Sequence, residues 1–483
     1  MSSIPGYYFD PEKKKYYKIQ PGHVAQSGSK YSKDEVKKRE KNSSKKKQTI
    51  SRNERTRLER VMRARILERP IIGHLGIEQE TGRCRVPDRD AIAQRTIACT
   101  RLMESRRLVD LGRRGEQYCH QFVRDPRTGI ILTALKPTST ANFRPISPDR
   151  PWKYDEHVDK GIIELDHREW ITSLSINSMG NVLMASQDLL SGEGIRLAVG
   201  RTIEPSEAYG KSSRSVFENL LIAFKRRDEW VSSAVACPST SKPLFAVGCS
   251  EELVTVECEA SQATLARVET FPAKISDVDW LDENVAIAGL QNSIIALHDM
   301  RCKASVSRFM HSHGVQKLKR VDDSRIIVAG IDHTLDMYDL RSTRTTIKSR
   351  PNPNKQSHEP TIPYLKFSEL NYTSLADMDV SSQLGLLACA TDLPKVQLFS
   401  LHTGKLLEAP PIPWRKGRQR PPKTGQRNVL YRDYQSPVDC VRFETVTEPD
   451  EYSKLAVEDC GRNTNSHVSL LVGSGKIIEE WAM

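Results

Sequence analysis

Residues 326–341 read IIVAGIDHTLDMYDLR, and this stretch decides the fold. Its first half is small and apolar, a polar break follows at Asp332 and His333, and apolar residues then alternate with polar ones. The pattern predicts two antiparallel strands joined by a tight turn, with Leu335 and Met337 facing the interior of a sheet. Asp332 is expected to form the turn, because aspartate side chains hydrogen-bond nearby backbone groups.

A sequence of the same kind, AIAGLQNSIIALHDMR, lies 40 residues earlier. Asn292 takes the turn position there. This segment ends in Asp299 and Arg301, as the later one ends in Asp339 and Arg341. In a ring of similar units, a spacing of one repeat places both arginines at equivalent positions on adjacent units.

Short segments of this type recur through most of the chain. Six of them begin alike, at Trp170, Trp230, Ile275, Val315, Leu375 and Val438, with intervals of 60, 45, 40, 60 and 63 residues. A period of about 40–45 residues with four strands per unit is typical of WD-type β-propellers. A further hairpin, 118–123 with 129–135, is expected to supply a seventh blade or its closing strand.

The sequence therefore predicts an all-β protein, a seven-bladed WD-type β-propeller over residues 115–483. The longer intervals contain loop-like inserts near 349–362, 408–436 and 445–467. The apolar segment 477–481 is expected to close the ring.

The region before the propeller differs in charge. Residues 1–70 hold 20 Lys and Arg against 8 Asp and Glu, a net charge of +12 that equals the net charge of the whole chain. Residues 1–50 are predicted to be a basic, mostly disordered arm, because they are rich in Lys and Ser and poor in aliphatic residues. An aromatic hairpin motif at 4–23 is the exception. The candidate nuclear-import residues are Lys37, Lys38, Arg39, Lys45, Lys46 and Lys47.

Residues 51–110 are predicted to form a helix–loop–helix. Within 54–69, one apolar face at helical spacing is made by Leu58, Val61, Met62 and Ile66. Pro70 follows the last turn of this helix. The second helix is expected over 89–108, where the apolar pattern is looser.

Several classes of function lack their motifs. The chain has no HExxH or GxSxG motif, and its ten cysteines include no CxxC pair. No apolar run reaches the ~18 residues of a membrane helix, and the N-terminus does not have the pattern of a secretory signal. We therefore expect no catalytic residues, no metal, no cofactor and no membrane association.

The two hairpin segments resemble the DWD box of WD-repeat proteins that bind the cullin-4 adaptor, the large damage-specific DNA-binding protein subunit. The later copy departs from the pattern at Val328, and the earlier one departs at Leu290 and His298. The N-terminal stretch PGYYFDPEKKKYY, closed by PGH at 21–23, closely resembles the arm of the cullin-4 associated factor 4 family, also called WD-repeat protein 21.

The resemblance implies a nuclear protein that serves as substrate receptor of a cullin-RING ubiquitin ligase. An additional cytoplasmic location stays open. It would present an unknown protein substrate and catalyse nothing itself. The implied adaptor-binding residues are Asp299, Arg301, Tyr338, Asp339 and Arg341, together with the apolar face of helix 54–69.

Two other interpretations stay open. An Asp-x-Arg sequence at the end of a blade can simply fix its own hairpin through a charge-assisted hydrogen bond. The chain could also be a nucleic-acid- or chromatin-associated WD-repeat scaffold. The basic arm and residues 415–427, which hold six basic residues and no acidic one, support that alternative.

Overall fold

The computed structural model describes parts of residues 7–59 and most of 97–482. Its main gaps are 60–96, 203–216, 343–359, 410–427 and 447–466, and shorter ones are marked along the sequence. The chain divides into two compact units, residues 1–80 and 81–483.

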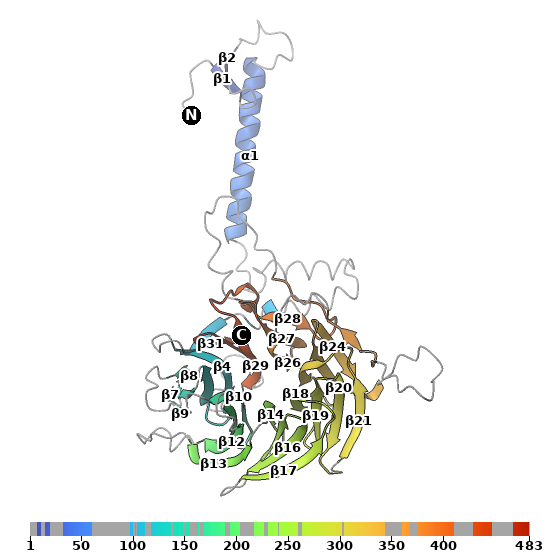
Figure 1. Ribbon diagram of the computed structural model, residues 1–483. Coiled ribbons are helices and arrows are strands. Elements are labelled where there is room, and N and C mark those ends of the chain that lie inside the picture. Colours follow the sequence, from blue (N-terminus) through green and yellow to red (C-terminus); the bar gives the residue numbers. More distant parts are fainter. Residues whose placement is uncertain are drawn as a thin grey trace, which may run out of the picture. The chain divides into compact units, whose positions relative to one another are not determined.

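The described part of the second unit forms seven antiparallel sheets of three or four strands, the blades of a β-propeller (Figure 1). Blades 1 and 2 are β4 (Tyr118–Arg124), β5 (Ile131–Lys136), β6 (Ser139–Phe143) and β9 (Ile163–Glu164), then β10 (Glu169–Ile176), β11 (Asn181–Asp188), β12 (Ile195–Thr202) and β13 (Phe217–Arg226). Blades 3 and 4 are β14 (Val231–Ala236), β15 (Leu244–Cys249), β16 (Glu252–Cys258) and β17 (Ala263–Thr270), then β18 (Ile275–Trp280), β19 (Val285–Leu290), β20 (Ile294–Asp299) and β21 (Ala304–Met310).

Blades 5 and 6 are β22 (Val315–Arg320), β23 (Arg325–Gly330), β24 (Thr334–Asp339) and β25 (Leu365–Lys366), then β26 (Leu375–Ser381), β27 (Leu386–Thr391) and β28 (Gln397–Ser400). Blade 7 is β29 (Val438–Val446), β30 (His467–Ser474), β31 (Ile477–Ala482) and β3 (Glu104–Asp110). A small ribbon, β7 (Pro145–Ser147) with β8 (Arg150–Tyr154), accompanies blade 1 in sequence. The first strand of each blade contacts the first strands of both neighbouring blades, so the ring is closed.

The predicted fold, a seven-bladed β-propeller, is confirmed. The hairpin predicted around residue 125 supplies the first two strands of blade 1. The C-terminal strand β31 lies between β30 and β3, so the ring is closed by strands from both sides of the propeller sequence.

The second predicted helix, 89–108, is wrong over its last residues. Residues 104–110 form strand β3, and helix is described only at 97–99. Leu108 and Val109 are 5% and 3% exposed in a cluster that includes Ile478 of β31. The free edge of β31 therefore decides the structure of this segment, because pairing with that edge buries apolar side chains that an isolated helix would expose.

The six similar segments that recur in the sequence begin with the same local structure, a β-bulge in the first strand of a blade. We call the first strand of each blade its inner strand. Each inner strand has a β-bulge near its start, where the pairing with the second strand shifts, at 119–121, 171–173, 231–233, 275–277, 315–317, 375–377 and 438–440. Side chains just after the bulge bind the next blade: Ser173 Oγ accepts from the Ala234 N–H at 3.0 Å, and an Asp277 carboxylate oxygen accepts from the Leu318 N–H at 2.9 Å. These polar groups link neighbouring blades, which explains why Ser and Asp recur there.

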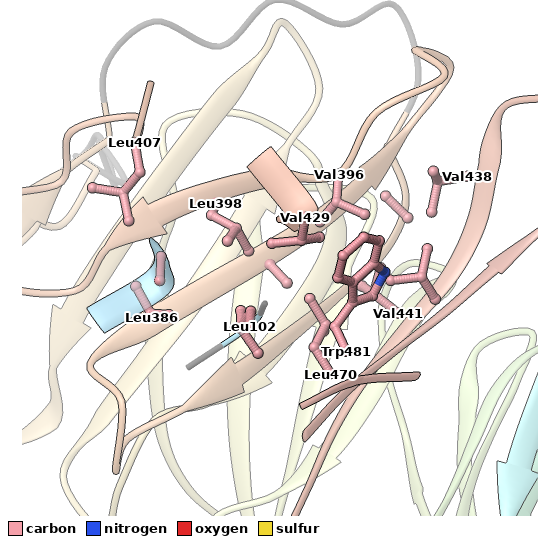
Figure 2. Close-up of a cluster of buried hydrophobic side chains, with 14 of the residues drawn as sticks. Leu102, Leu386, Val396, Leu398, Leu407, Val429, Val438, Val441, Leu470 and Trp481 are labelled. Atoms are coloured by element: carbon pink, nitrogen blue, oxygen red, sulfur yellow. The ribbon is translucent and has the colours of Figure 1, made fainter. Parts of the chain in front are cut away.

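One core cluster joins the last two blades to the chain segment before the propeller (Figure 2). Trp481 is fully buried in this cluster, and its indole Nε1–H donates to the Tyr434 hydroxyl at 3.0 Å. Leu102 and Val429 pack in the same cluster and are linked by a backbone hydrogen bond. The insert predicted at 408–436 is therefore too long: residues 428–434 belong to the core.

The described part of the first unit contains a hairpin and a helix. Strands β1 (Tyr7–Asp10) and β2 (Lys15–Lys18) pair within the aromatic motif at 4–23, with Tyr8 opposite Tyr17. Helix α1 (Lys33–Glu59) follows. Of the residues expected on the apolar helix face, Leu58 lies in the last turn of α1, whereas Val61, Met62 and Ile66 lie outside the described residues.

Helix α1 contradicts two predictions. Residues 1–50 were predicted to be mostly disordered, and a domain boundary was predicted at residue 51, but one helix spans 33–59. The Ser32 Oγ accepts a hydrogen bond from the Glu35 N–H at 3.4 Å, and Asp34 and Glu35 stand in the first turn. Acidic residues near a helix start are stabilising, and Lys, Arg and Glu are good helix formers, so the charged composition is compatible with a helix. The candidate import residues all lie on α1, and Lys45, Lys46 and Lys47 are exposed.

Blade 5 contains a buried hydrogen-bonded group around His311. Its Nδ1 lies 2.7 Å from the Tyr338 hydroxyl oxygen, and its Nε2 lies 3.0 Å from the Thr334 Oγ1. Tyr338 is 1% exposed, and its ring centroid is 5.4 Å from that of Phe309. The group ties the loop before β22 to β24 within one blade.

We expect His311 to make stability depend on pH. Burial lowers the pKa of His311 from 6.5 to about 4. The folded state therefore favours the neutral ring, and this contribution is present above pH 6.5 and is lost as the pH falls towards 4. The shift corresponds to about 3 kcal/mol.

Denaturant unfolding of wild type and His311→Asn between pH 8 and pH 4 measures this effect. Other buried groups titrate in both proteins, so the informative quantity is the difference in unfolding free energy, which should shrink by up to about 3 kcal/mol on acidification. His402→Asn, at an exposed histidine of blade 6, is the matched control. A pH-independent difference would show that His311 does not titrate in this way.

Candidate functional site

The turn after β20 holds Asp299 and Arg301 in a fixed pair. One Asp299 carboxylate oxygen accepts from the Arg301 backbone N–H at 2.9 Å and from its Nε–H at 3.0 Å. The other carboxylate oxygen accepts from Nη2 at 2.7 Å. The Arg301 side chain is still 68% exposed, whereas that of Asp299 is 10% exposed.

The turn after β24 repeats this geometry one blade further on. Asp339 accepts from the Arg341 backbone N–H and Nε–H at 3.0 Å each, and from Nη2 at 2.8 Å. The Arg341 side chain is 73% exposed and that of Asp339 is 15% exposed. Two adjacent blades therefore present the same Asp-fixed guanidinium.

Hydrogen bonding keeps both carboxylates ionised to a lower pH than an ordinary aspartate. The side-chain hydrogen bonds from Arg301 lower the pKa of Asp299 to about 2. Those from Arg341 lower the pKa of Asp339 in the same way. A bidentate pair of this type fixes the plane of the guanidinium as well as its position. Each arginine is thus exposed and held in one orientation.

The two pairs lie at the same end of the ring. The backbone N–H of Met300 donates to the Asn284 carbonyl at 2.8 Å, and that of Leu340 donates to the Ser324 carbonyl at 2.7 Å. These bonds join the turn after the third strand to the turn after the first strand in blades 4 and 5. We call the surface made by Asp299, Arg301, Asp339 and Arg341 the arginine rim. Its position is the one that the 40-residue spacing predicts.

Tyr338 does not belong to this surface. It was expected to contact an adaptor, but its side chain is buried and its hydroxyl is bound to His311. His298, at the equivalent place in blade 4, is also buried, with its Nδ1 2.8 Å from a Glu269 carboxylate oxygen. Tyr338 and His298 are therefore part of the interior of blades 5 and 4.

The predicted turn residues lie at the opposite end of blades 4 and 5. Asp332 and His333 both have positive φ, 63° and 58°, in the three-residue loop between Gly330 and Thr334. Aspartate tolerates this left-handed conformation better than most residues do. Asn292 Oδ1 accepts from the Ile294 N–H at 3.3 Å, and Ser293 has a φ of 74°. Both residues occupy the tight turns that the sequence predicted.

Two further side chains lie beside the arginine rim. Arg325 is paired with Asp322 at 2.6 Å in the first turn of blade 5 and acts electrostatically on Asp339. Tyr364 is 63% exposed, and it interacts electrostatically with Arg341. Tyr364 was not among the predicted site residues, because it directly follows the predicted loop-like insert near 349–362. The apolar run TIPYL directly after the polar stretch was the available signal.

The described residues contain no group of three or more His, Cys, Asp or Glu side chains that could hold a metal ion. Within the same part of the chain, no helix combines the length and the apolar character that crossing a membrane requires. The arginine rim presents two exposed guanidinium groups in fixed orientations, so it is a candidate binding surface.

Comparison with known proteins gives one short sequence match. No family model matches the chain. WD repeat-containing protein 21 of Schizosaccharomyces pombe (strain 972 / ATCC 24843) is 28% identical over 112 residues, which is 22% of this chain and 25% of that protein. The match supports a WD-repeat protein.

Among solved structures, the chain is similar to the β-propeller domain of Cps50 (Swd1) from Myceliophteria thermophila. The sequences are 11% identical, the TM-score is 0.47, and the alignment covers 76% of this chain and 97% of that one.

Proposed function

We propose that the protein is a non-enzymatic substrate receptor of a cullin-4 RING ubiquitin ligase, and that the arginine rim contacts the damage-specific DNA-binding protein adaptor. The observation that carries the proposal is the pair of exposed, Asp-fixed arginines at equivalent positions of adjacent blades. The resemblance of both segments to the DWD box supplies the identity of the partner. The protein substrate would bind elsewhere on the propeller, and the expected location is the nucleus.

The physical chemistry of the rim suits a protein interface. Arginine is less strongly hydrated than lysine, and its planar group bonds carbonyls and carboxylates in two directions. Because Asp299 and Asp339 already fix the guanidinium planes, binding loses less side-chain entropy at these positions. Tyr364 adds exposed aromatic area next to Arg341, and Tyr and Arg are enriched among residues that dominate binding energy.

Each Asp–Arg pair could have one of two roles, and an experiment can distinguish them. In one, the pair only fixes its own hairpin; in the other, it also orients an arginine for a partner. The first role predicts that loss of the pair changes stability and leaves binding per folded molecule unchanged. The second predicts a change in affinity.

We expect Asp339→Ala to weaken adaptor binding while Arg341 is still present. Without its carboxylate partner, the arginine side chain gains rotational freedom that binding must remove, a cost of about 1 kcal/mol or roughly a fivefold loss of affinity. Calorimetric titration of purified adaptor measures this. Asp323→Ala is the matched control, because Asp323 lies in the first turn of the same blade and its side chain is 90% exposed. Equal affinities for Asp339→Ala and wild type would favour the hairpin-fixing role alone.

A simple experiment tests the proposed function. Purified full-length protein and purified adaptor are mixed and passed through a size-exclusion column. The proposal expects co-elution in a single complex that survives 150 mM salt. Separate elution at micromolar concentrations of both proteins would remove it.

The second candidate function is a nucleic-acid- or chromatin-associated scaffold. It is favoured by the exposed lysines of α1 and by the concentration of the net positive charge in residues 1–70. Affinity for a 30-base-pair DNA duplex should then fall steeply with salt, since phosphate contacts release counterions. Affinity that does not depend on salt, or no binding at 50 mM salt, would exclude this candidate.

A further inference from the structure

The end of the ring opposite to the arginine rim carries three exposed aromatic side chains on consecutive blades. Tyr118, Trp170 and Trp230 each stand directly before the first bulge position of an inner strand, in blades 1, 2 and 3. They are 40%, 43% and 49% exposed. Equivalent positions on adjacent blades place these rings along one arc, which we call the aromatic crescent.

Topology places the crescent opposite the arginine rim. Strands alternate in direction within each blade, so the start of the first strand and the turn after the second strand lie at one end. The Ser250 N–H, in such a turn, donates to the Trp230 carbonyl at 2.6 Å. Lys136, the last residue of β5, pairs with Tyr118 across the same end of blade 1. The arginine rim occupies the turns at the other end.

The first two rings of the crescent already bind a cation from the chain itself. The Lys136 Nζ lies 5.2 Å from the Trp170 ring centroid and 6.0 Å from the Tyr118 ring centroid. Asp439, the bulge residue of β29 in blade 7, acts electrostatically on the same ammonium. Two aromatic rings of blades 1 and 2 therefore lie near one positive charge, which a carboxylate of blade 7 also attracts.

Lys136 is only loosely suited to this position. Burial lowers the pKa of Lys136, so holding its ammonium there costs free energy, and the Asp439 carboxylate offsets part of that cost. The side chain is a flexible four-carbon stem at the end of a strand, and it can leave without breaking the sheet. A cation with a better approach to the rings could therefore replace it.

We infer that Tyr118, Trp170 and Asp439 form a cation site for a lysine or arginine side chain of a protein partner, and that Lys136 occupies this site when the partner is absent. The charges select the class of partner: Asp439 attracts a basic side chain and repels a nucleic-acid phosphate. Trp230, one blade further on, offers a half-exposed ring to the residues that flank the bound side chain. The site does not depend on the proposed ligase function, although a substrate could use it.

The test uses three variants and two fluorescein-labelled peptides. The probe peptide carries one lysine in a Gly/Ser sequence, and the control peptide carries norleucine in its place. Lys136→Met removes the internal cation and keeps the apolar stem. Lys274→Met is the matched control, because Lys274 is an exposed lysine at the position of the crescent residues in blade 4. Lys136→Met combined with Trp170→Leu keeps apolar bulk but removes the ring.

Removal of Lys136 should raise the affinity for the lysine peptide about tenfold over wild type. Lys274→Met should bind like wild type, the Trp170→Leu combination should lose the gain, and the norleucine peptide should bind none of the proteins. The inference is overturned if Lys136→Met gains nothing or if both peptides bind alike. It is also overturned if a single-stranded oligonucleotide binds and its binding depends on Trp170. Thermal melts confirm that each variant is folded, and any unfolded double variant is replaced by Trp170→Phe, which should retain part of the gain.

Discussion

Deletion of residues 476–483 should leave the protein unfolded. Strand β31 lies inside blade 7, with β30 on one side and β3 on the other, so its loss leaves two strand edges unpaired. Trp481 is fully buried and hydrogen-bonded to Tyr434. Loss of a buried Trp side chain alone costs about 3–5 kcal/mol, and a whole domain is stable by only about 5–15 kcal/mol.

The measurement is a thermal melt followed by circular dichroism, together with the soluble fraction after expression. Deletion of Met483 alone is the matched control, since that residue lies beyond the end of β31, and it should melt like the full-length protein. A truncated protein with the full-length melting temperature would contradict ring closure by β31 and β3.

Substitution of both rim arginines by alanine should nearly abolish adaptor binding. If each arginine anchors the interface, its loss costs on the order of 2 kcal/mol, about a thirtyfold drop in affinity. Arg301 and Arg341 stand on different blades and have different aspartate partners, so their effects should be roughly additive, about a thousandfold for the pair. Both side chains are mostly exposed, so folding should be little affected.

A binding titration of purified adaptor with wild type, both single variants and the double variant tests this. Arg308→Ala is the matched control: it removes an arginine that is 47% exposed on the outer strand of blade 4, away from the rim. Thermal melts accompany each titration. Lower melting temperatures with unchanged affinity would instead show that the two pairs only fix their hairpins.

The propeller was predictable from the sequence because each blade is built from contacts close in sequence. The inner-strand bulge, the small residues of the second strand and the Asp or Asn turn are local features, and they recur at readable intervals. The 40-residue spacing between Arg301 and Arg341 was likewise sufficient to place both on one rim. The resemblance implied an adaptor contact for Tyr338, whereas the side chain is buried against Phe309 of β21 and His311 of the loop before β22.

The remaining errors share a physical cause. Strand β3 takes its conformation from the edge of β31, which follows it by more than 360 residues, so local periodicity favoured a helix. Helix α1 has few aliphatic residues, and composition alone indicated disorder where helix-forming charged residues and a Ser32 cap are present. In the sequence, the aromatic crescent appears only as a Trp at the start of two of the similar segments. A cation site could not be predicted from these residues alone, because Lys136 and Asp439 come from other blades.

The most direct test of the proposed receptor role is a comparison in cells. Tagged wild type and the Arg301→Ala/Arg341→Ala variant are expressed at equal levels, purified by affinity, and the bound proteins are quantified by mass spectrometry. The proposal predicts the adaptor and cullin-4 among the most enriched partners of wild type, with both reduced at least tenfold for the variant. Equal recovery of both proteins, or their absence from the wild-type sample, would contradict it.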